Sequence, residues 1–199
     1  MHRKLGLLVG LGLLVGVSGA RAQSTAMPSF NAPYRAFAMH EFGGTLSFPE
    51  GDATGLEGQY RFGYKTLDIG VRGGILDQPG DNVILLGATG RVRVVTHTEQ
   101  FPFDGAFITG LGTRDFDNAI IPVGLSLGRR IDFEESPISI VPYAQPTLWM
   151  VFDDNDLNDT ILFGLGLGAD FRFSNTFDVR ASVGVGDIEG FSVSAVWVR

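Results

Sequence analysis

The sequence alternates between apolar residues and polar or glycine residues over ten successive stretches, and this pattern constrains the fold more than any other feature. A period of two is typical of a β-strand with one buried face. Short clusters of Asp, Gly, Pro and Asn separate the stretches, as expected for hairpin turns, and the sequence contains no helical repeat of useful length. The predicted strands cover residues 36–48, 54–65, 67–76, 82–95, 104–113, 119–131, 138–151, 160–173, 177–186 and 190–198.

Ten strands joined by short hairpins predict an all-β fold, an antiparallel up-and-down transmembrane β-barrel over residues 34–199. Stretches 36–48 and 104–113 alternate least regularly, so eight strands remain the alternative. An even strand number brings both ends of the barrel to the same rim. Residues 23–33, rich in Ser, Ala and Pro, are expected to form an N-terminal linker in front of it.

One face of each predicted strand is bulky and apolar, whereas the other is small or charged. The apolar faces carry on the order of fifty side chains, although a barrel of about eight strands has an interior that its own side chains just fill. So many bulky groups would coat the outside of a barrel but would not fit inside it. We therefore predict that the apolar faces contact lipid and the charged faces line the lumen, as in transmembrane barrels.

The polar faces place charges of both signs among glycines. Because buried charges must be paired, we expect ion pairs that stiffen a narrow lumen. A constricted, charge-lined path for small solutes is the alternative. The predicted lumen charges are Glu57, Arg61, Asp68, Arg72, Arg91, Arg93, Arg130, Asp170, Arg172, Asp178 and Arg180.

Residues 1–22 have the features of a cleaved secretory signal peptide, namely a basic start, an apolar run, and small residues at Ala20 and Ala22. Cleavage after Ala22 removes three basic residues and no acidic one, so the formal charge falls from −7 to −10. This charge excludes nucleic acid as a partner, because nucleic-acid binding needs a basic surface. The absence of cysteine excludes disulfides and thiolate metal sites.

Aromatic residues near the ends of the predicted strands are typical of the interfacial girdles of membrane barrels. With this pattern, residues 34–199 resemble the small bacterial outer-membrane β-barrel proteins, a porin-like family of eight- to ten-stranded barrels. The resemblance implies a monomer in the cell outer membrane, with lipid, lipopolysaccharide and the barrel-assembly machinery as partners. Members of that family usually end on an aromatic residue, whereas this chain ends on Arg199. The girdle candidates are Phe48, Tyr64, Phe171, Phe173, Phe177, Phe191 and Trp197.

The sequence predicts neither catalysis nor a cofactor. The predicted mature chain has two histidines, His40 and His97, and no sequence feature pairs either of them with a serine nucleophile. A hard cation prefers several oxygen ligands from one loop, and one acidic loop of this chain offers them without the spacing of an EF-hand. The weak candidates for that metal site are Asp153, Asp154, Asp156 and Asp159.

Three functions remain open at this point. The leading hypothesis is a non-enzymatic outer-membrane barrel with a structural, adhesive or narrow-channel role. The second is a soluble periplasmic or secreted β-barrel that binds an apolar ligand. The third is a lipid-modifying membrane enzyme that uses His40 or His97.

Overall fold

The computed structural model describes residues 24–33, 37, 39–134, 136–153 and 160–199, so the predicted signal peptide over residues 1–22 lies outside the described residues. The described part consists of strands, turns and extended chain, and none of its residues forms a helix long and apolar enough to cross a membrane. Its strands are β1 (His40–Pro49), β2 (Thr54–Tyr64), β3 (Leu67–Gln78), β4 (Asp81–Val95), β5 (Asp104–Arg114), β6 (Asn118–Gly128), β7 (Ile131–Asp132), β8 (Ser139–Asp153), β9 (Thr160–Arg172), β10 (Phe177–Gly186) and β11 (Gly190–Val198).

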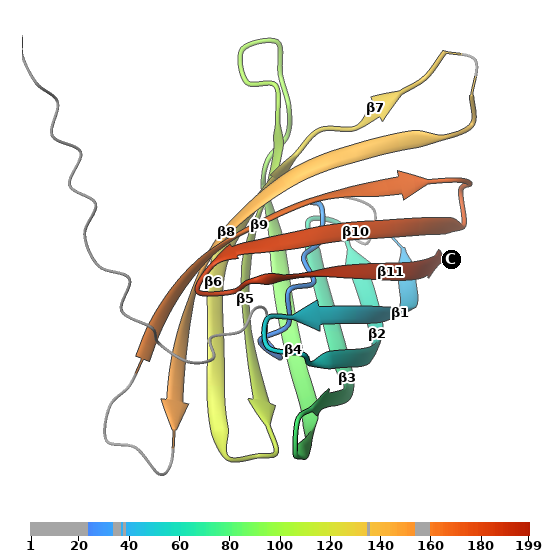
Figure 1. The fold of residues 1–199 in the computed structure, drawn as a ribbon. Coiled ribbons are helices and arrows are strands. Elements are labelled where there is room, and N and C mark those ends of the chain that lie inside the picture. The colour runs from blue at the N-terminus through green and yellow to red at the C-terminus, as the bar shows by residue number, and fades with distance from the viewer. Residues whose placement is uncertain (1–23, 34–36, 38, 135, 154–159) are drawn as a thin grey trace, which may run out of the picture.

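The ten long strands form one closed antiparallel barrel, whose wall curves around a central space in Figure 1. Each strand pairs with the next one along the chain, except that β6 pairs with β8 across the short β7. The pairing of β1 with β11 closes the ring. The predicted all-β antiparallel barrel of ten strands is therefore confirmed, and the alternative of eight strands is excluded.

The two rims of the barrel differ in the connections that they carry. The first rim, here the terminal rim, holds the start of β1, the end of β11 and the longer connections that follow β4 and β6. The opposite rim, here the far rim, holds tight turns such as the one between β3 and β4. In that turn Pro79 presets a negative φ and Gly80 has a φ of 91°, which is the combination that a type II turn requires.

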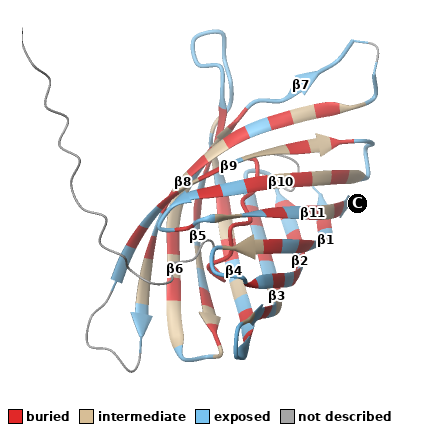
Figure 2. Ribbon diagram, in the orientation of Figure 1, coloured by how far each residue is buried: buried red, intermediate tan, exposed pale blue. Residues whose placement is uncertain are grey.

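Burial alternates along the strands and appears as red and pale-blue bands in Figure 2. On β2, Leu56 and Tyr60 point outward and are 61% and 44% exposed, whereas Glu57 and Arg61 point inward and are 2% and 3% exposed. The strand therefore exposes its apolar side chains and buries its charged ones. This is the reverse of the pattern in a water-soluble barrel and matches the predicted orientation of the faces.

The predicted strand over 119–131 is interrupted in the structure. β6 ends at Gly128, and the next two residues, Arg129 and Arg130, are both exposed. The chain then forms the two-residue β7, which pairs only with the start of β8 and adds no strand to the closed ring. Two successive arginines cannot continue a strand whose faces alternate between an apolar surface and a filled interior, which accounts for the break.

Residues 24–33, here called the lumen segment, run through the inside of the barrel as the blue trace in Figure 1. All ten residues are buried. Near the far rim, Met27 packs in one apolar cluster with Ala53 and Leu76. Toward the terminal rim, Pro33 lies so close to Gly128 that an added Cβ there would meet its ring at 3.1 Å. A linker was expected from this composition, but the segment fills the lumen.

Candidate functional site: the filled lumen

The lumen contains a balanced set of buried charges. Among the described residues, six arginines and six carboxylates are buried. Because an unpaired charge in such an interior is costly, equal numbers of both signs are the arrangement that a closed lumen requires. These residues are Glu41, Glu57, Arg61, Asp68, Arg72, Arg91, Asp104, Arg114, Asp170, Arg172, Asp178 and Arg180.

Arg180 on β10 joins one group of these charges. Its Nη1 and Nη2 atoms donate to the two carboxylate oxygens of Glu41 at 2.8 and 2.7 Å. Its Nε lies 3.2 Å from Asp170 Oδ2 on the neighbouring strand β9. Nη1 also donates to the side-chain oxygen of Asn31 in the lumen segment at 2.9 Å. The two-pronged bond to Glu41 fixes the guanidinium in one plane.

Asp68 on β3 joins a second group and bridges two arginines. It accepts from Arg61 Nε at 2.8 Å and also from Arg61 Nη2, while its other oxygen accepts from Arg91 Nη2 at 2.5 Å. Arg61 donates further to Thr89 Oγ1 at 3.0 Å. One carboxylate therefore holds two guanidinium groups that would otherwise repel each other inside the barrel.

A third group connects the charges directly to the lumen segment. Arg72 lies 3.4 Å from Glu57 Oε2 and donates to Gln59 Oε1 at 3.0 Å. Arg72 also donates to Ser29 Oγ at 2.6 Å, and Thr25 Oγ1 donates to Glu57 Oε1 at 2.6 Å. The segment is therefore part of the charge network. We call the eight charged side chains of these three groups the charged wall: Glu41, Glu57, Arg61, Asp68, Arg72, Arg91, Asp170 and Arg180.

The structure places most of the predicted lumen charges inside, with two differences. Arg93 is only half-buried and lies over the ring of Phe37, 4.9 Å from its centroid. Arg130 does not face the lumen at all, because it lies beyond the end of β6. Its side chain is 49% exposed and pairs with the exposed Asp132 at 2.6 Å.

Three buried charges were not among the predicted ones. Glu41 lies in the least regular first stretch, where the alternation gives little guidance. Asp104 and Arg114 are the first and last residues of β5, so a pattern that needs neighbours on both sides cannot assign their faces. Arg114 donates to the backbone oxygens of Thr25 and Ala26 at 3.2 and 3.3 Å, contacts that no periodicity could have predicted.

Another part of the lumen is lined by apolar side chains. Side chains from β6, β8 and β9 pack with Ile188 and with Phe30, Ala26 and Ala32 of the lumen segment. The strand residues of this cluster, here called the apolar wall, are Ile120, Val141, Tyr143, Trp149 and Leu162.

The barrel holds the lumen segment mainly through its backbone carbonyl groups. The segment pairs with none of the strands, and the donors are side chains of both walls and of neighbouring strands. An extended peptide buried in this way needs a partner for each polar backbone group. The donations to its backbone oxygens include Arg91 to Ala32 at 2.7 Å, Ser126 to Asn31 at 2.7 Å, Tyr143 to Phe30 at 2.8 Å and Ser182 to Pro28 at 3.1 Å.

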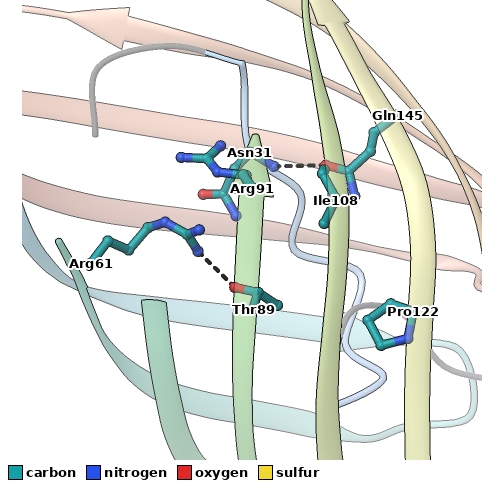
Figure 3. Close-up of a pocket in the computed structure, with 7 residues that line it drawn as sticks. All are labelled: Asn31, Arg61, Thr89, Arg91, Ile108, Pro122 and Gln145. Atoms are coloured by element: carbon teal, nitrogen blue, oxygen red, sulfur yellow. Dashed lines mark hydrogen bonds between the residues drawn. The ribbon is translucent and has the colours of Figure 1, made fainter. Parts of the chain in front are cut away.

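A small cavity lies where the lumen segment meets the charged wall (Figure 3). Its volume is about 10 Å³, roughly what one water molecule needs. In the figure, Asn31 bonds to Gln145 and Arg61 to Thr89 across this space. The cavity has no room for an organic ligand. Its lining residues are Asn31, Arg61, Thr89, Arg91, Ile108, Pro122 and Gln145.

Both described histidines lie close to the terminal rim. Nδ1 of His40 lies 2.6 Å from the hydroxyl of Tyr60, and Nδ1 of His97 lies 2.8 Å from Asp104 Oδ2. Among the residues that the structure describes, no serine hydrogen-bonds to either ring. His97 and Asp104 therefore form a histidine–carboxylate pair at this rim.

The candidate metal ligands fall mostly outside the described residues. Asp153 is the exposed last residue of β8, whereas Asp154, Asp156 and Asp159 belong to the stretch that is not described. In the described ranges, no three His, Cys, Asp or Glu side chains lie close enough together to hold a metal ion. The acidic loop thus stays a prediction.

Aromatic pairs mark both ends of the outer surface at β1 and β11. Near the terminal rim, Trp197 stacks with Phe42 at 6.2 Å between ring centroids and contacts Phe177 at 5.2 Å. Near the far rim, Phe48 stacks with Phe191 at 4.7 Å. On this side of the barrel, the outward pairs lie near the two rims, where the interfacial girdles of a membrane barrel would lie.

No protein-family model matches the chain, and none of the curated proteins matches it either. A solved structure described as "De novo design of transmembrane beta-barrels" is similar over 81% of this chain and 96% of that chain. The two sequences are 10% identical, and the TM-score is 0.44. A similarity of this size carries no argument about function.

Proposed function

We propose that this chain is an exported outer-membrane β-barrel with a structural or adhesive role and no enzymatic activity, whose lumen is closed in the state described. The strands turn their charged faces inward and their apolar faces outward, and this observation supports the proposal more than any other. The charges of the wall lie inside in balanced numbers, and the bulky apolar side chains lie outside. A chain folded for water would place them the other way round.

The outer surface fits a bilayer in extent as well as in polarity. On β3 alone, Ile69, Val71 and Ile75 are 51%, 54% and 55% exposed. Soluble monomers rarely expose contiguous apolar patches of more than a few hundred square ångströms. The long strands contain 9 to 15 residues, and a tilted membrane strand needs about 9 to 11.

The partners follow from this location. The outer face would contact lipid, and the loops would meet lipopolysaccharide. The predicted signal peptide would direct export, and the barrel-assembly machinery would insert the chain as a monomer. We propose no cofactor. We also propose no nucleic-acid partner, because the exposed turns of the far rim carry carboxylates such as Glu50, Asp81 and Asp187.

The alternative of a soluble barrel that binds an apolar ligand receives less support. Such a ligand needs an apolar cavity of several hundred cubic ångströms. In the described lumen, residues 24–33 occupy the space, and the cavity beside them that is lined by Asn31 and Arg61 has a volume of about 10 Å³.

A charge placed on the outer face tests the membrane proposal. Val71 points outward near the middle of β3, so Val71→Arg should destabilise a barrel folded in lipid vesicles by about 2–4 kcal/mol. In a soluble protein, the same exposed substitution should change stability by about 0.5 kcal/mol or less. Glu50→Arg, in an exposed turn of the far rim, is the matched control.

The readout combines urea unfolding in vesicles with the mobility of boiled and unboiled protein on a denaturing gel. Recovery of the unaltered mature chain only in detergent, with a heat-dependent mobility shift and a large Val71→Arg effect, would support the proposal. Recovery as a soluble monomer, with Val71→Arg no worse than Glu50→Arg, would refute it.

A further inference from the structure

The barrel wall has glycine at the places where the lumen segment lies closest. A Cβ added to Gly112 would overlap the backbone of Ser24, and one added to Gly166 would overlap the ring of Phe30. Neither glycine has a positive φ, so the backbone conformation does not require glycine there. The missing side chains instead make room for the lumen segment. The wall is therefore shaped to its occupant.

The occupant is nevertheless separate from the wall. The strand order closes into a ring without residues 24–33, and the segment takes part in no strand pairing. Within the described part of the chain, the one backbone–backbone hydrogen bond of the segment joins Ser29 N to the Met27 oxygen at 2.7 Å, inside the segment itself. Release of the segment would break side-chain contacts but would leave the backbone hydrogen bonds between all paired strands intact.

The space that the segment occupies extends along the barrel from one rim to the other. Met27 packs against Leu76 close to the far rim, and Pro33 lies against Gly128 at the terminal rim. Between them, the ring of Phe30 lies directly over Gly166, which has no side chain to occupy that space. Removal of the segment would open a passage about as wide as one extended peptide.

The wall of that passage would be polar on one side. Arg72, Arg91 and Arg180 would keep their carboxylate partners, because each is paired with the barrel as well as with the segment. The hydrogen bonds of the Arg114 side chain go to Thr25, Ala26 and Met27, so this guanidinium would turn to water. A passage lined by hydrated charges conducts ions, whereas a dry apolar one does not.

We propose that residues 24–33 are a plug and that the barrel contains a latent aqueous pore for small ions and solutes along the path of this segment. This inference rests on the proposed function, because a pore needs a membrane-spanning barrel. With the plug in place, the barrel does not conduct ions. Displacement of the plug opens it, and a free peptide with the sequence of residues 24–33 closes it again.

Conductance across planar lipid bilayers tests the plug. We compare the mature chain with a variant that lacks residues 24–33 and with the double variant Gly112→Ala/Gly166→Ala, whose added methyl groups overlap the segment but leave the lumen wide. Gly90→Ala is the matched control, because a Cβ there meets open space. The unaltered chain and the control should be silent, and both other variants should conduct.

Adding the free peptide to the deletion variant provides the second measurement. The peptide should block the current, and a peptide with Phe30→Ala should need a concentration at least about tenfold higher, because it lacks the ring that fits over Gly166. Block at equal concentrations by both peptides would contradict a lumen shaped to this sequence.

The gel shift separates failure of this proposal from failure of the proposed function. A deletion variant that keeps the heat-dependent shift but does not conduct overturns the pore, and so does an unaltered chain that conducts equally well. If both variants lose the shift, the segment is an integral part of the barrel's fold, and the plug is refuted. If the unaltered chain itself shows no shift and does not insert, the proposed function fails instead.

Discussion

The charged wall and the apolar wall hold the same lumen segment by different physical means. The charged wall uses directional hydrogen bonds to the segment, such as those from Arg180 to Asn31 and from Arg91 to Ala32, and pairs with carboxylates such as Glu41 fix the planes of these guanidinium groups. The apolar wall uses shape, with Phe30 packed in one cluster with Trp149 and covering Gly166. The first wall should therefore be sensitive to charge at constant volume, and the second to volume at constant charge.

The two walls also differ in what would follow from their failure. A broken ion pair in the charged wall leaves a buried charge attached to a barrel strand, so the barrel itself is destabilised. A gap in the apolar wall affects mainly the contact with the lumen segment, which can leave without breaking any strand pairing. The comparison thus separates the stability of the barrel from the occupancy of its lumen.

Asp68→Asn should have the largest effect. The substitution keeps the shape of the side chain but leaves Arg61 and Arg91 without their shared carboxylate. Removal of one partner from a buried ion pair costs about 3–5 kcal/mol, and we expect a loss of this size in the free energy of unfolding in detergent micelles, measured by urea titration. A loss below about 1 kcal/mol would mean that water reaches the two guanidinium groups.

The sequence was sufficient to predict the charged wall except for Glu41, because the strands that carry its other members alternate regularly. On β3, Asp68 and Arg72 stand between outward apolar residues, so their faces could be assigned without any structure. The apolar wall could not be found in this way, because the residues around Ile120 on β6 and Trp149 on β8 are apolar on both faces. Nothing in their pattern separates Ile120 or Trp149, which point inward, from their outward neighbours.

The position of the lumen segment could not be predicted either. A short run rich in Ser, Ala and Pro has the composition of a linker, and only tertiary contacts distinguish the two roles. Those contacts join residues that are far apart in sequence, such as Asn31 with Arg180 and Phe30 with Tyr143. The small side chains that suggest a linker are also the ones that fit a narrow lumen.

Phe30→Ala should have the next largest effect, but on the segment and not on the barrel. Replacement of a buried phenylalanine by alanine lowers stability by at least about 3 kcal/mol in a protein core. Here we expect the substitution to weaken the binding of the segment, because the segment can be released while the barrel stays folded. In a Trp197→Phe background, the fluorescence of Trp149 should shift to longer wavelength and become accessible to acrylamide. The heat-dependent gel shift should remain.

The exposed Phe116, in a turn of the far rim, is the control for this experiment. Phe116→Ala should leave Trp149 as protected as in the unaltered chain. If Phe30→Ala abolished the gel shift as well, the apolar wall would stabilise the barrel itself, and the distinction between the two walls would be lost.

Tyr143→Phe should have a smaller effect, because it removes one hydrogen bond and leaves the packing of the apolar wall in place. Its hydroxyl donates to the backbone oxygen of Phe30 at 2.8 Å. One such bond contributes about 1 kcal/mol, so the quenching of Trp149 should rise only slightly. An effect as large as that of Phe30→Ala would show that hydrogen bonding, and not the packing of apolar side chains, holds the segment on the apolar wall as well.

Asp132→Asn should have the smallest effect and isolates burial as the cause of the first prediction. Asp132 accepts from Arg130 Nε at 2.6 Å, a distance similar to the 2.8 Å between Arg61 Nε and Asp68. Its side chain is 64% exposed, whereas that of Asp68 is fully buried. An exposed pair contributes about 0–1 kcal/mol because water solvates each charge when the pair is broken, so the urea midpoint should hardly move. Equal losses of unfolding free energy for Asp132→Asn and Asp68→Asn would mean that geometry alone sets the strength of these ion pairs. Burial inside the barrel would then contribute nothing to the stability of the charged wall.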